Sequence, residues 1–246
     1  MIEALILRLD APMMSFGGTA VDAIGRTEPC PTLSMLTGLL ANALGYDHRD
    51  AEKTSALQER VRFAARRDFG GETRVEYQTV DLGQPHMNDK HAWTTRGYVE
   101  TRSGGSEARY GTHQRYRHFL VDSAFTVALT VAPADEGPAL DDLERALRWP
   151  ERPLFLGRKS CIPSAPLVEK QARVQAASLR DAVLAAELVR EGATLARVWW
   201  PENDADTEGA HRFALTDRRD WRNQLHVGRR FVYSKDFALP GGHADE

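Results

Sequence analysis

The sequence predicts an α+β protein in which strands and helices follow in the order β-α-β-β-α-β, with a smaller β-rich region behind them. Three observations support this prediction. Residues 2–9 and 125–131 alternate apolar side chains with smaller or polar ones, as half-buried strands do. Leucines recur at helical spacing after Thr32, and a second amphipathic segment precedes Pro150. With 246 residues, 42% of them hydrophobic, the chain can bury one large core or two smaller ones.

The first helix has clear start and stop signals. A long loop, residues 10–31, follows the first predicted strand and leads to Thr32, whose hydroxyl is placed to cap a helix. Residues 33–44 carry almost no charge, so this helix is expected to be buried. Gly45 suits the left-handed position that commonly ends a helix.

The next elements complete the expected order. A second helical segment covers residues 50–59, and residues 61–69 and 73–81 alternate like strands. Residues 125–131 form the next strand, and residues 140–147 form a helix that Pro150 ends.

A last strand near residues 165–170 gives a ferredoxin-like (RRM-like) β-α-β-β-α-β domain over residues 1–170. Residues 82–117 are an insert in it, and residues 171–246 form the smaller C-terminal region. That region is expected to hold a helix at 178–190 and strands at 194–200, 211–216 and 228–233.

Composition limits the classes of function. The formal net charge of −3 means that a nucleic-acid partner would need a local basic patch. No run reaches the ~18 apolar residues of a membrane span, and the charged start of the chain favours a strand over a signal peptide. Cys30 and Cys161 form no CxxC pair, which fits a cytoplasmic protein.

The insert contains such a basic patch. Residues 96–118 hold five arginines and two glutamates, with Tyr98, Tyr110 and Tyr116 interleaved. Guanidinium groups pair with phosphates and tyrosine rings stack on bases, so this hairpin could hold single-stranded RNA. The alternative is an ordinary hairpin with solvated surface arginines.

The stretch "PLFLGRKSC", residues 153–161, has two interpretations. It lacks the spacing of a nucleotide-binding loop, and the prolines that follow prevent a long helix from starting on Ser160. Gly157 indicates a backbone turn with a positive φ or a close approach by another chain. Arg158 and Lys159 then either meet an RNA phosphate or pair with acidic residues on a neighbouring element.

The sequence contains no recognisable catalytic or metal-binding motif: HExxH, H-x-x-x-H and GxSxG are absent, and no cofactor is predicted. Prolines and cations beside Cys161 could lower the pKa of its thiol, but a small packed cysteine is the simpler interpretation. A metal-independent ribonuclease could use a histidine, a tyrosine and a lysine, and the chain has all three residue types.

Four stretches resemble the CasD family of the RAMP superfamily, which supplies a subunit of the type I-E CRISPR Cascade. They are "LRLDAPMMSFGG", "PTLSMLTGLLANALG", "YRHFLVDSAFTVAL" and "PLFLGRKSCIPSAPL", within roughly residues 5–170, and "RVEYQTVDLG" also fits. Leu33 stands where the family often has lysine or arginine, and Phe16 replaces a frequent tryptophan.

The resemblance implies a non-catalytic scaffold that grips the 5′ handle of the guide RNA with its ferredoxin-like domain and a protruding thumb hairpin. Such a subunit contacts the Cascade backbone subunit and the large subunit, and target DNA only indirectly. The implied RNA-binding residues are Phe16, Gly17, Arg26, Thr32, Ser34, Tyr77, Arg102, Arg109, Arg115, Arg117, Gly157, Arg158 and Lys159. A metal-independent endoribonuclease that matures CRISPR RNA, as in a related subfamily, remains the alternative function.

Overall fold

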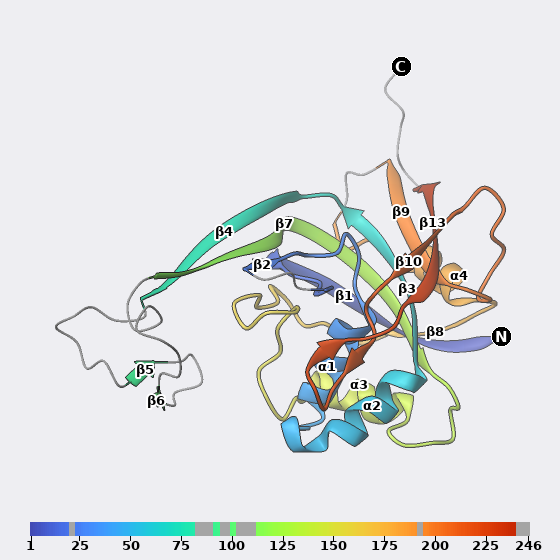
Figure 1. The fold of residues 1–246 in the computed structure, drawn as a ribbon. Coiled ribbons are helices and arrows are strands. Elements are labelled where there is room, and N and C mark those ends of the chain that lie inside the picture. Colours follow the sequence, from blue (N-terminus) through green and yellow to red (C-terminus); the bar gives the residue numbers. More distant parts are fainter. Residues whose placement is uncertain (20–22, 82–90, 94–98, 102–111, 191–193, 240–246) are drawn as a thin grey trace.

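One large sheet organises the chain, as a computed structural model shows (Figure 1). The structure describes residues 1–19, 23–81, 91–93, 99–101, 112–190 and 194–239. The main sheet has the strand order β10-β13-β9-β3-β7-β1-β8, and β2 and β4 also pair with β7. Its described pairings are antiparallel except that of β2 with β7. The predicted α+β class is therefore confirmed.

The main-sheet strands are β1 (Ile2–Met14), β2 (Ile24–Gly25), β3 (Val61–Phe69), β4 (Glu72–Asp81), β7 (Thr112–Val131), β8 (Arg173–Ala176), β9 (Leu195–Pro201), β10 (His211–Leu215) and β13 (Arg230–Ala238). Two small hairpins pair β5 (His91–Trp93) with β6 (Val99–Thr101), and β11 (Arg219–Asp220) with β12 (Leu225–His226). The helices are α1 (Leu33–Ala43), α2 (Ala51–Arg60), α3 (Leu140–Arg148) and α4 (Leu179–Ala185), with a 3₁₀ turn at His48–Asp50.

Local sequence signals located the first elements well. The predicted strand at 61–69 has the bounds of β3, and the side chain of Thr32 caps α1 by accepting a hydrogen bond from the Met35 amide. Gly45 has a φ of +81° after that helix, as its position indicated. β1 continues to Met14 beyond the predicted end because it pairs with β7 as far as Leu120.

Four predicted elements differ from the structure. The strand expected at 125–131 begins at Thr112, so the last residues of the expected insert belong to β7, because they pair with β4. Residues 165–170 form no strand: prolines interrupt this segment, and it bonds to β1 only at separate points, such as Arg8 N to Leu167 O at 2.9 Å. The strand that pairs there is β8, at 173–176. Helix 178–190 ends at Ala185, because the carbonyl groups around its end are bonded by Arg66. The last strand runs to Ala238, along β9.

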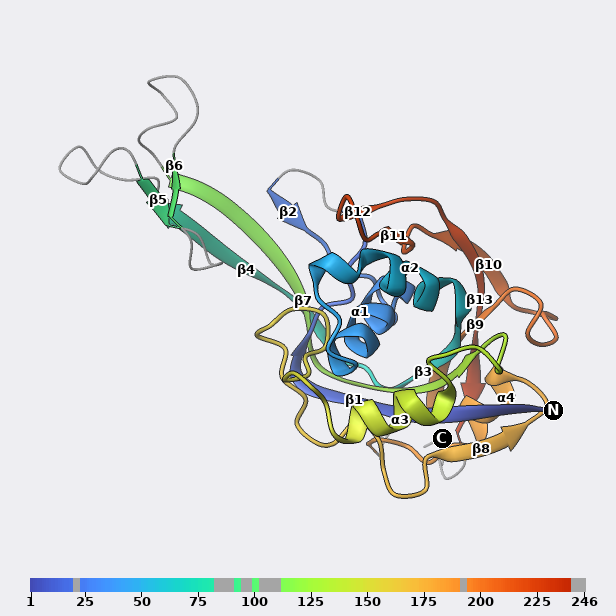
Figure 2. The ribbon, with the colours of Figure 1, turned by 90° about the horizontal axis from the view of Figure 1, so that it is seen from below.

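Helices cover both faces of the sheet. Leu5, Leu7 and Leu9 of β1 belong to the larger core with α1 and α3, and the three helices α1, α2 and α3 lie together on that side (Figure 2). Ala4, Ala64 and Ala128 face the other way, and these small side chains make room for α4 and Trp200 in a second core. The strands of residues 195–238 continue the same sheet through the pairing of β3 with β9.

β4 and the first half of β7 leave the body as a long hairpin (Figure 1). This hairpin carries the ends of the predicted insert. No helix in the described part of the chain is long and apolar enough to cross a membrane.

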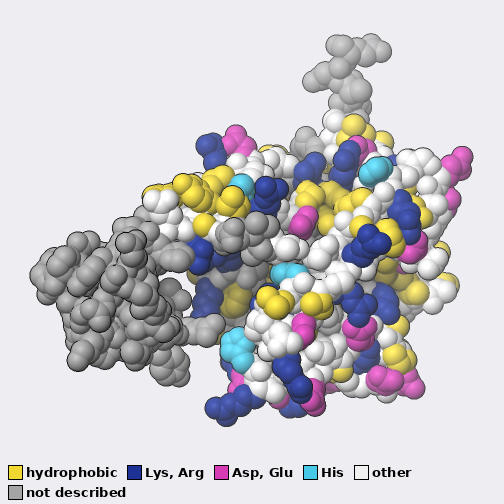
Figure 3. Space-filling model, in the orientation of Figure 1, with side chains coloured by type: hydrophobic (Ala, Val, Ile, Leu, Met, Phe, Trp, Pro, Cys, Tyr) yellow, Lys and Arg dark blue, Asp and Glu magenta, His cyan; other side chains and the backbone are white. Residues whose placement is uncertain are grey.

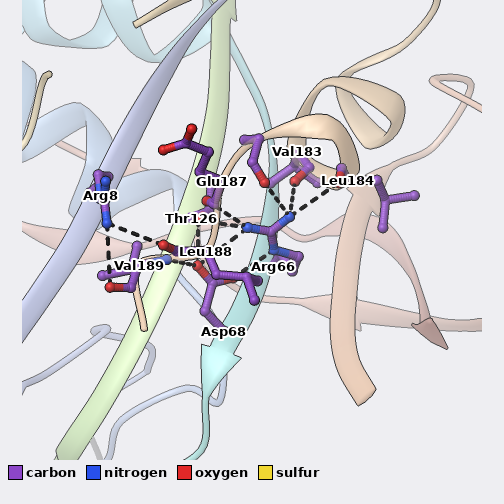
Figure 4. Close-up of polar contacts among 10 residues, drawn as sticks. Arg8, Arg66, Asp68, Thr126, Val183, Leu184, Glu187, Leu188 and Val189 are labelled. Atoms are coloured by element: carbon purple, nitrogen blue, oxygen red, sulfur yellow. Dashed lines mark hydrogen bonds and ion pairs between the residues drawn. The ribbon is translucent and has the colours of Figure 1, made fainter. Parts of the chain in front are cut away.

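A buried arginine fastens the segment after α4 to the sheet (Figure 4). The side chain of Arg66 is 1% exposed, and its guanidinium donates to the carbonyl groups of Val183, Ala186 and Glu187. The Asp68 carboxylate neutralises it, with the Arg66 Nε at 2.6 Å. The same carboxylate accepts bonds from the Thr126 hydroxyl at 2.6 Å and the Val189 amide at 2.7 Å. Every charge in this cluster is therefore paired, which offsets the cost of burying it.

We expect Asp68→Asn to lower the free energy of unfolding by ~3–5 kcal/mol, because the Arg66 cation would remain buried without a counter-charge. Urea denaturation measures the loss. Glu72→Gln is the matched control, since Glu72 pairs with Arg74 where both side chains are 70% exposed, and such a pair contributes only ~0–1 kcal/mol. Equal losses in the two variants would contradict this account.

Candidate nucleic-acid interface

The base of the β4–β7 hairpin has two different faces. Tyr77 lies opposite Tyr116 in the β4–β7 register, with ring centroids 5.2 Å apart. The two residues are 51% and 40% exposed, and Val75 beside them is 53% exposed. Because side chains alternate along a strand, Arg115 and Arg117 point to the opposite face. The hairpin therefore presents a tilted pair of rings on one side, and on the other side guanidinium groups with Glu76 opposite Arg117.

Arg117 is held in place by its neighbours on the ribbon. Its Nε donates to the Gln78 side-chain oxygen at 2.7 Å. β2 pairs in parallel with β7 and places Gly25 opposite Arg117. Arg115 lies two residues before Arg117 on β7 and is half-buried. The sequence analysis did not predict a role for Gln78 or Gly25, because neither residue has a charged or aromatic side chain.

Arg158 joins three segments at this point. Its guanidinium donates to the carbonyl oxygens of His118 and Gly25, both at 3.0 Å. It also lies 4.7 Å above the centre of the buried Phe119 ring. Burial, and then the charge of Arg117, lower the pKa of Arg158. Neither bond goes to an acidic side chain, so Arg158 braces the hairpin base without losing its positive charge.

Gly25 separates the two guanidinium groups. A Cβ at Gly25 would lie 2.9 Å from the Arg158 Nη2 and 3.9 Å from the Arg117 Nη1. Two like charges therefore share a small surface beside a bare backbone, which an anion could approach. Arg26 and Lys159 follow directly in sequence and are exposed. Figure 3 shows Lys and Arg side chains gathered where the body meets the hairpin.

Gly157 fixes the loop that carries Arg158 and Lys159. Its φ of +98° confirms the expected left-handed conformation. A Cβ there would overlap the carbonyl oxygen of Ser15, so the close approach at Gly157 is made by a segment of the same chain. The Ser15 amide in turn donates to the Leu156 carbonyl at 3.1 Å. The loop is thereby packed against the end of β1.

Three of the predicted RNA-binding residues, Phe16, Thr32 and Ser34, lie inward of this surface, and Gly17 is half-buried next to them. Phe16 is fully buried and packs edge-on against Phe125, with ring centroids 5.2 Å apart. The Gly17 carbonyl accepts a bond from the Thr32 hydroxyl at 3.2 Å, and Ser34 is 6% exposed. These residues shape the loop beneath the surface. Arg102 and Arg109 lie outside the described residues.

The N-terminus of α1 already holds an anion of the protein itself. The buried Asp217 carboxylate accepts a bond from the Leu33 amide at 2.8 Å, and Arg230 pairs with it at 2.9 Å. The Ser34 hydroxyl lies 3.2 Å from the His226 Nε2. Asp217 thus occupies the position where a helix N-terminus would attract a phosphate. No local sequence signal indicates this contact, because 184 residues separate Leu33 from Asp217.

The described residues offer little of the chemistry of a catalytic centre. Among them there is no group of three or more His, Cys, Asp or Glu that could hold a metal ion. Burial raises the pKa of the Cys30 thiol to about 12 and also raises that of Cys161. Cys161 has no exposed surface, which confirms its interpretation as a packed residue.

Comparisons with known proteins agree on one family. The family described as "CRISPR-associated protein (Cas_Cas5)" matches residues 4–233. The "CRISPR system Cascade subunit CasD" of Escherichia coli (strain K12) is 35% identical over 163 residues, which are 66% of this chain and 68% of that protein. A chain of a solved "CRISPR RNA-guided surveillance complex" has a TM-score of 0.68 and 26% identity, covering 97% of this chain and 91% of its own. A "Crystal structure of Cas protein" has a TM-score of 0.59 at 24% identity, covers 96% and 95%, and shares the fold.

We expect Gly157→Ala to lower the free energy of unfolding by at least ~1–2 kcal/mol, the cost that a left-handed conformation alone imposes on an L side chain. The overlap with the Ser15 carbonyl would add to that loss. Gly70→Ala is the control, because its nearest neighbour would be Arg67 at 3.8 Å, an ordinary contact. Thermal and urea unfolding of both variants measure the difference, and equal stability would disprove the packing role of Gly157.

Proposed function

Because this chain belongs to the CRISPR-associated Cas5 family, we propose that it is an RNA-binding scaffold subunit of a type I-E Cascade. In this role it holds the 5′ handle of the guide RNA between the base of the β4–β7 hairpin and the Gly157 loop. The observation that carries the proposal is the meeting of Arg117 and Arg158 around Gly25, with exposed Arg26 and Lys159 beside them. Guanidinium and ammonium groups at that spacing suit consecutive phosphates of a single strand.

The proposed contacts divide the predicted residues into two groups. Arg26, Arg115, Arg117 and Lys159 are the phosphate contacts, and Tyr77 offers a ring for base stacking. Phe16, Thr32 and Ser34 are buried and act by positioning. Gly17 and Gly157 do so through their backbones, since the Gly17 carbonyl accepts the Thr32 hydroxyl bond and the exposed Gly157 packs against Ser15. Arg158 belongs to both groups, since it braces the hairpin and adds positive charge to the same surface. Arg102 and Arg109, outside the described residues, remain predicted contacts.

The same proposal includes the finer topology. The strand order β3-β7-β1-β8, with α1 and α3 on one face, supports a ferredoxin-like unit in which β8 is the fourth strand. With β8 as its fourth strand, this unit extends past the expected boundary at residue 170 to Ala176, and β9, β10 and β13 belong to the smaller C-terminal region. The hairpin of β4 and β7, with the insert of residues 82–117, would be the thumb.

We further propose that the subunit is non-catalytic and works in the cytoplasm, in contact with a backbone subunit and the large subunit. The relative named as a Cascade subunit and the chain from a surveillance complex support an assembled role. Contact with target DNA would then be indirect, through the assembly.

RNA-binding measurements should distinguish the residues that contact RNA from Arg158, which also supports the hairpin base. For single-stranded RNA with the repeat-derived 5′ end, Arg117→Ala and Lys159→Ala should each weaken binding. Each should also reduce the salt slope by ~0.7, the value for one lost single-strand phosphate contact. Arg158→Ala should also lower the thermal midpoint, because two carbonyl groups lose their donor. Lys170→Ala is the control, as an exposed cation of another segment. Unchanged affinity and slope in the first two variants would refute the proposed interface.

A cleavage assay tests the alternative function. Labelled precursor CRISPR RNA incubated with the isolated protein in EDTA should stay intact, because the proposed role is to hold RNA and both thiols are buried. Multiple-turnover cleavage that a single histidine substitution abolishes would establish a ribonuclease instead.

A further inference from the structure

A second basic site lies away from the hairpin. A cleft of about 540 Å³ opens between the end of α2, the start of β3 and the loop from β9 to β10. Its lining includes Arg62, Arg218, Arg229 and Arg230. Figure 3 shows a group of Lys and Arg side chains over β10 and β13, apart from the group beside the hairpin. The volume of the cleft lies in the range of ~300–1,000 Å³ that is typical of small-ligand sites.

The carboxylates of the cleft are already bonded within the protein. Glu59 pairs with Arg218, and Glu202 pairs with Arg212 at 3.0 Å. The Asp204 carboxylate accepts bonds at 3.0 Å from the amides of Leu179 and Arg180, at the start of α4. These carboxylates therefore leave the remaining arginines without acidic partners.

Arg62 and Arg229 are those remaining arginines. The Arg62 Nη1 donates only to carbonyl oxygens, at 2.7 Å to Glu59 and 3.0 Å to Val61. The Arg229 guanidinium stacks 5.7 Å from the centre of the Phe231 ring. Both residues are exposed, and neither has a carboxylate partner within the described ranges. The lining holds four arginines and three carboxylates, a formal charge of +1, and Arg62 and Arg229 are its arginines without a carboxylate partner among the described residues.

Aromatic rings orient the guanidinium groups around the cleft. Arg230 lies 4.7 Å above the buried Phe63 ring while it pairs with Asp217. Arg212 lies 3.6 Å from the centre of the Phe231 ring, on which Arg229 also stacks. Stacked, planar guanidinium groups lose less freedom when they bind a second group, and their paired N–H donors fit phosphate oxygens.

We propose that this cleft is a phosphate-binding site, separate from the hairpin interface. Two guanidinium groups without carboxylate partners in a concave site can each donate paired N–H groups to the oxygens of a phosphate monoester or pyrophosphate, which carry more negative charge than a single carboxylate. The phosphate can come from a free nucleotide or from a strand of nucleic acid. The inference does not depend on the function proposed above.

Titration calorimetry of the full chain with inorganic pyrophosphate, ATP and a single-stranded RNA tests the site. The variant is Arg62→Gln with Arg229→Gln, and the control is Arg145→Gln with Lys170→Gln, two exposed cations that do not line the cleft. We expect pyrophosphate to raise the thermal midpoint of the wild type and the control, and its affinity to fall at least tenfold in the cleft variant. The midpoint without ligand shows whether the variant is folded.

The probes distinguish the sources of the phosphate. If ATP binds and the RNA salt slope is unchanged in the cleft variant, the ligand is a free nucleotide. If the slope falls, the ligand is a strand of nucleic acid.

Equal pyrophosphate affinity in the wild type and a folded cleft variant would overturn the proposal, as would preference for an aspartate-rich peptide. Cleft-dependent pyrophosphate binding without any RNA binding would keep this inference and reject the proposed function. RNA binding that depends on Arg117 alone, without pyrophosphate binding, would do the opposite.

Discussion

The backbone hydrogen-bond ladder of β7 connects the core of the protein to its basic surface. One half of this strand pairs with β1 and β3 in the core, and the other half pairs with β4 and β2 at the hairpin base. The change of partner occurs at Gly71, where a Cβ would overlap the Val121 carbonyl oxygen, and at Asp122, with a φ of +53°. Because one continuous strand spans both regions, the position of Arg117 follows from packing in the core.

The buried motif residues support this surface from below. Phe16, Thr32 and Ser34 fix the loop after β1 against α1, and that loop receives Gly157 through Ser15. A rigid support reduces the entropy lost when side chains become ordered on a ligand. Short motifs can therefore mark an interface even where their own side chains never reach it. A substitution at such a residue would affect RNA binding through the shape of the loop.

The distribution of charge explains how an acidic chain can hold an anion. Most carboxylates near the arginines are engaged in local pairs, such as Asp217 with Arg230 and Asp68 with Arg66. Arg117 instead bonds to a neutral amide, and Arg158 bonds to carbonyl oxygens. The net charge of −3 therefore says little about the local field, which depends on which cations lack a counter-charge.

The sequence alone determined the elements whose signals are local. Alternation defined β3, the hydroxyl of Thr32 defined the start of α1, and Gly157 indicated its own backbone conformation. The four motifs also identified the family. Only the tertiary structure decided which residues meet: Asp217 at the N-terminus of α1, Gly25 between two arginines, and Arg66 at the end of α4. These contacts join segments far apart in the chain, and their partners are often backbone carbonyl groups. Every residue carries such a carbonyl, so its position in space leaves no trace in the sequence.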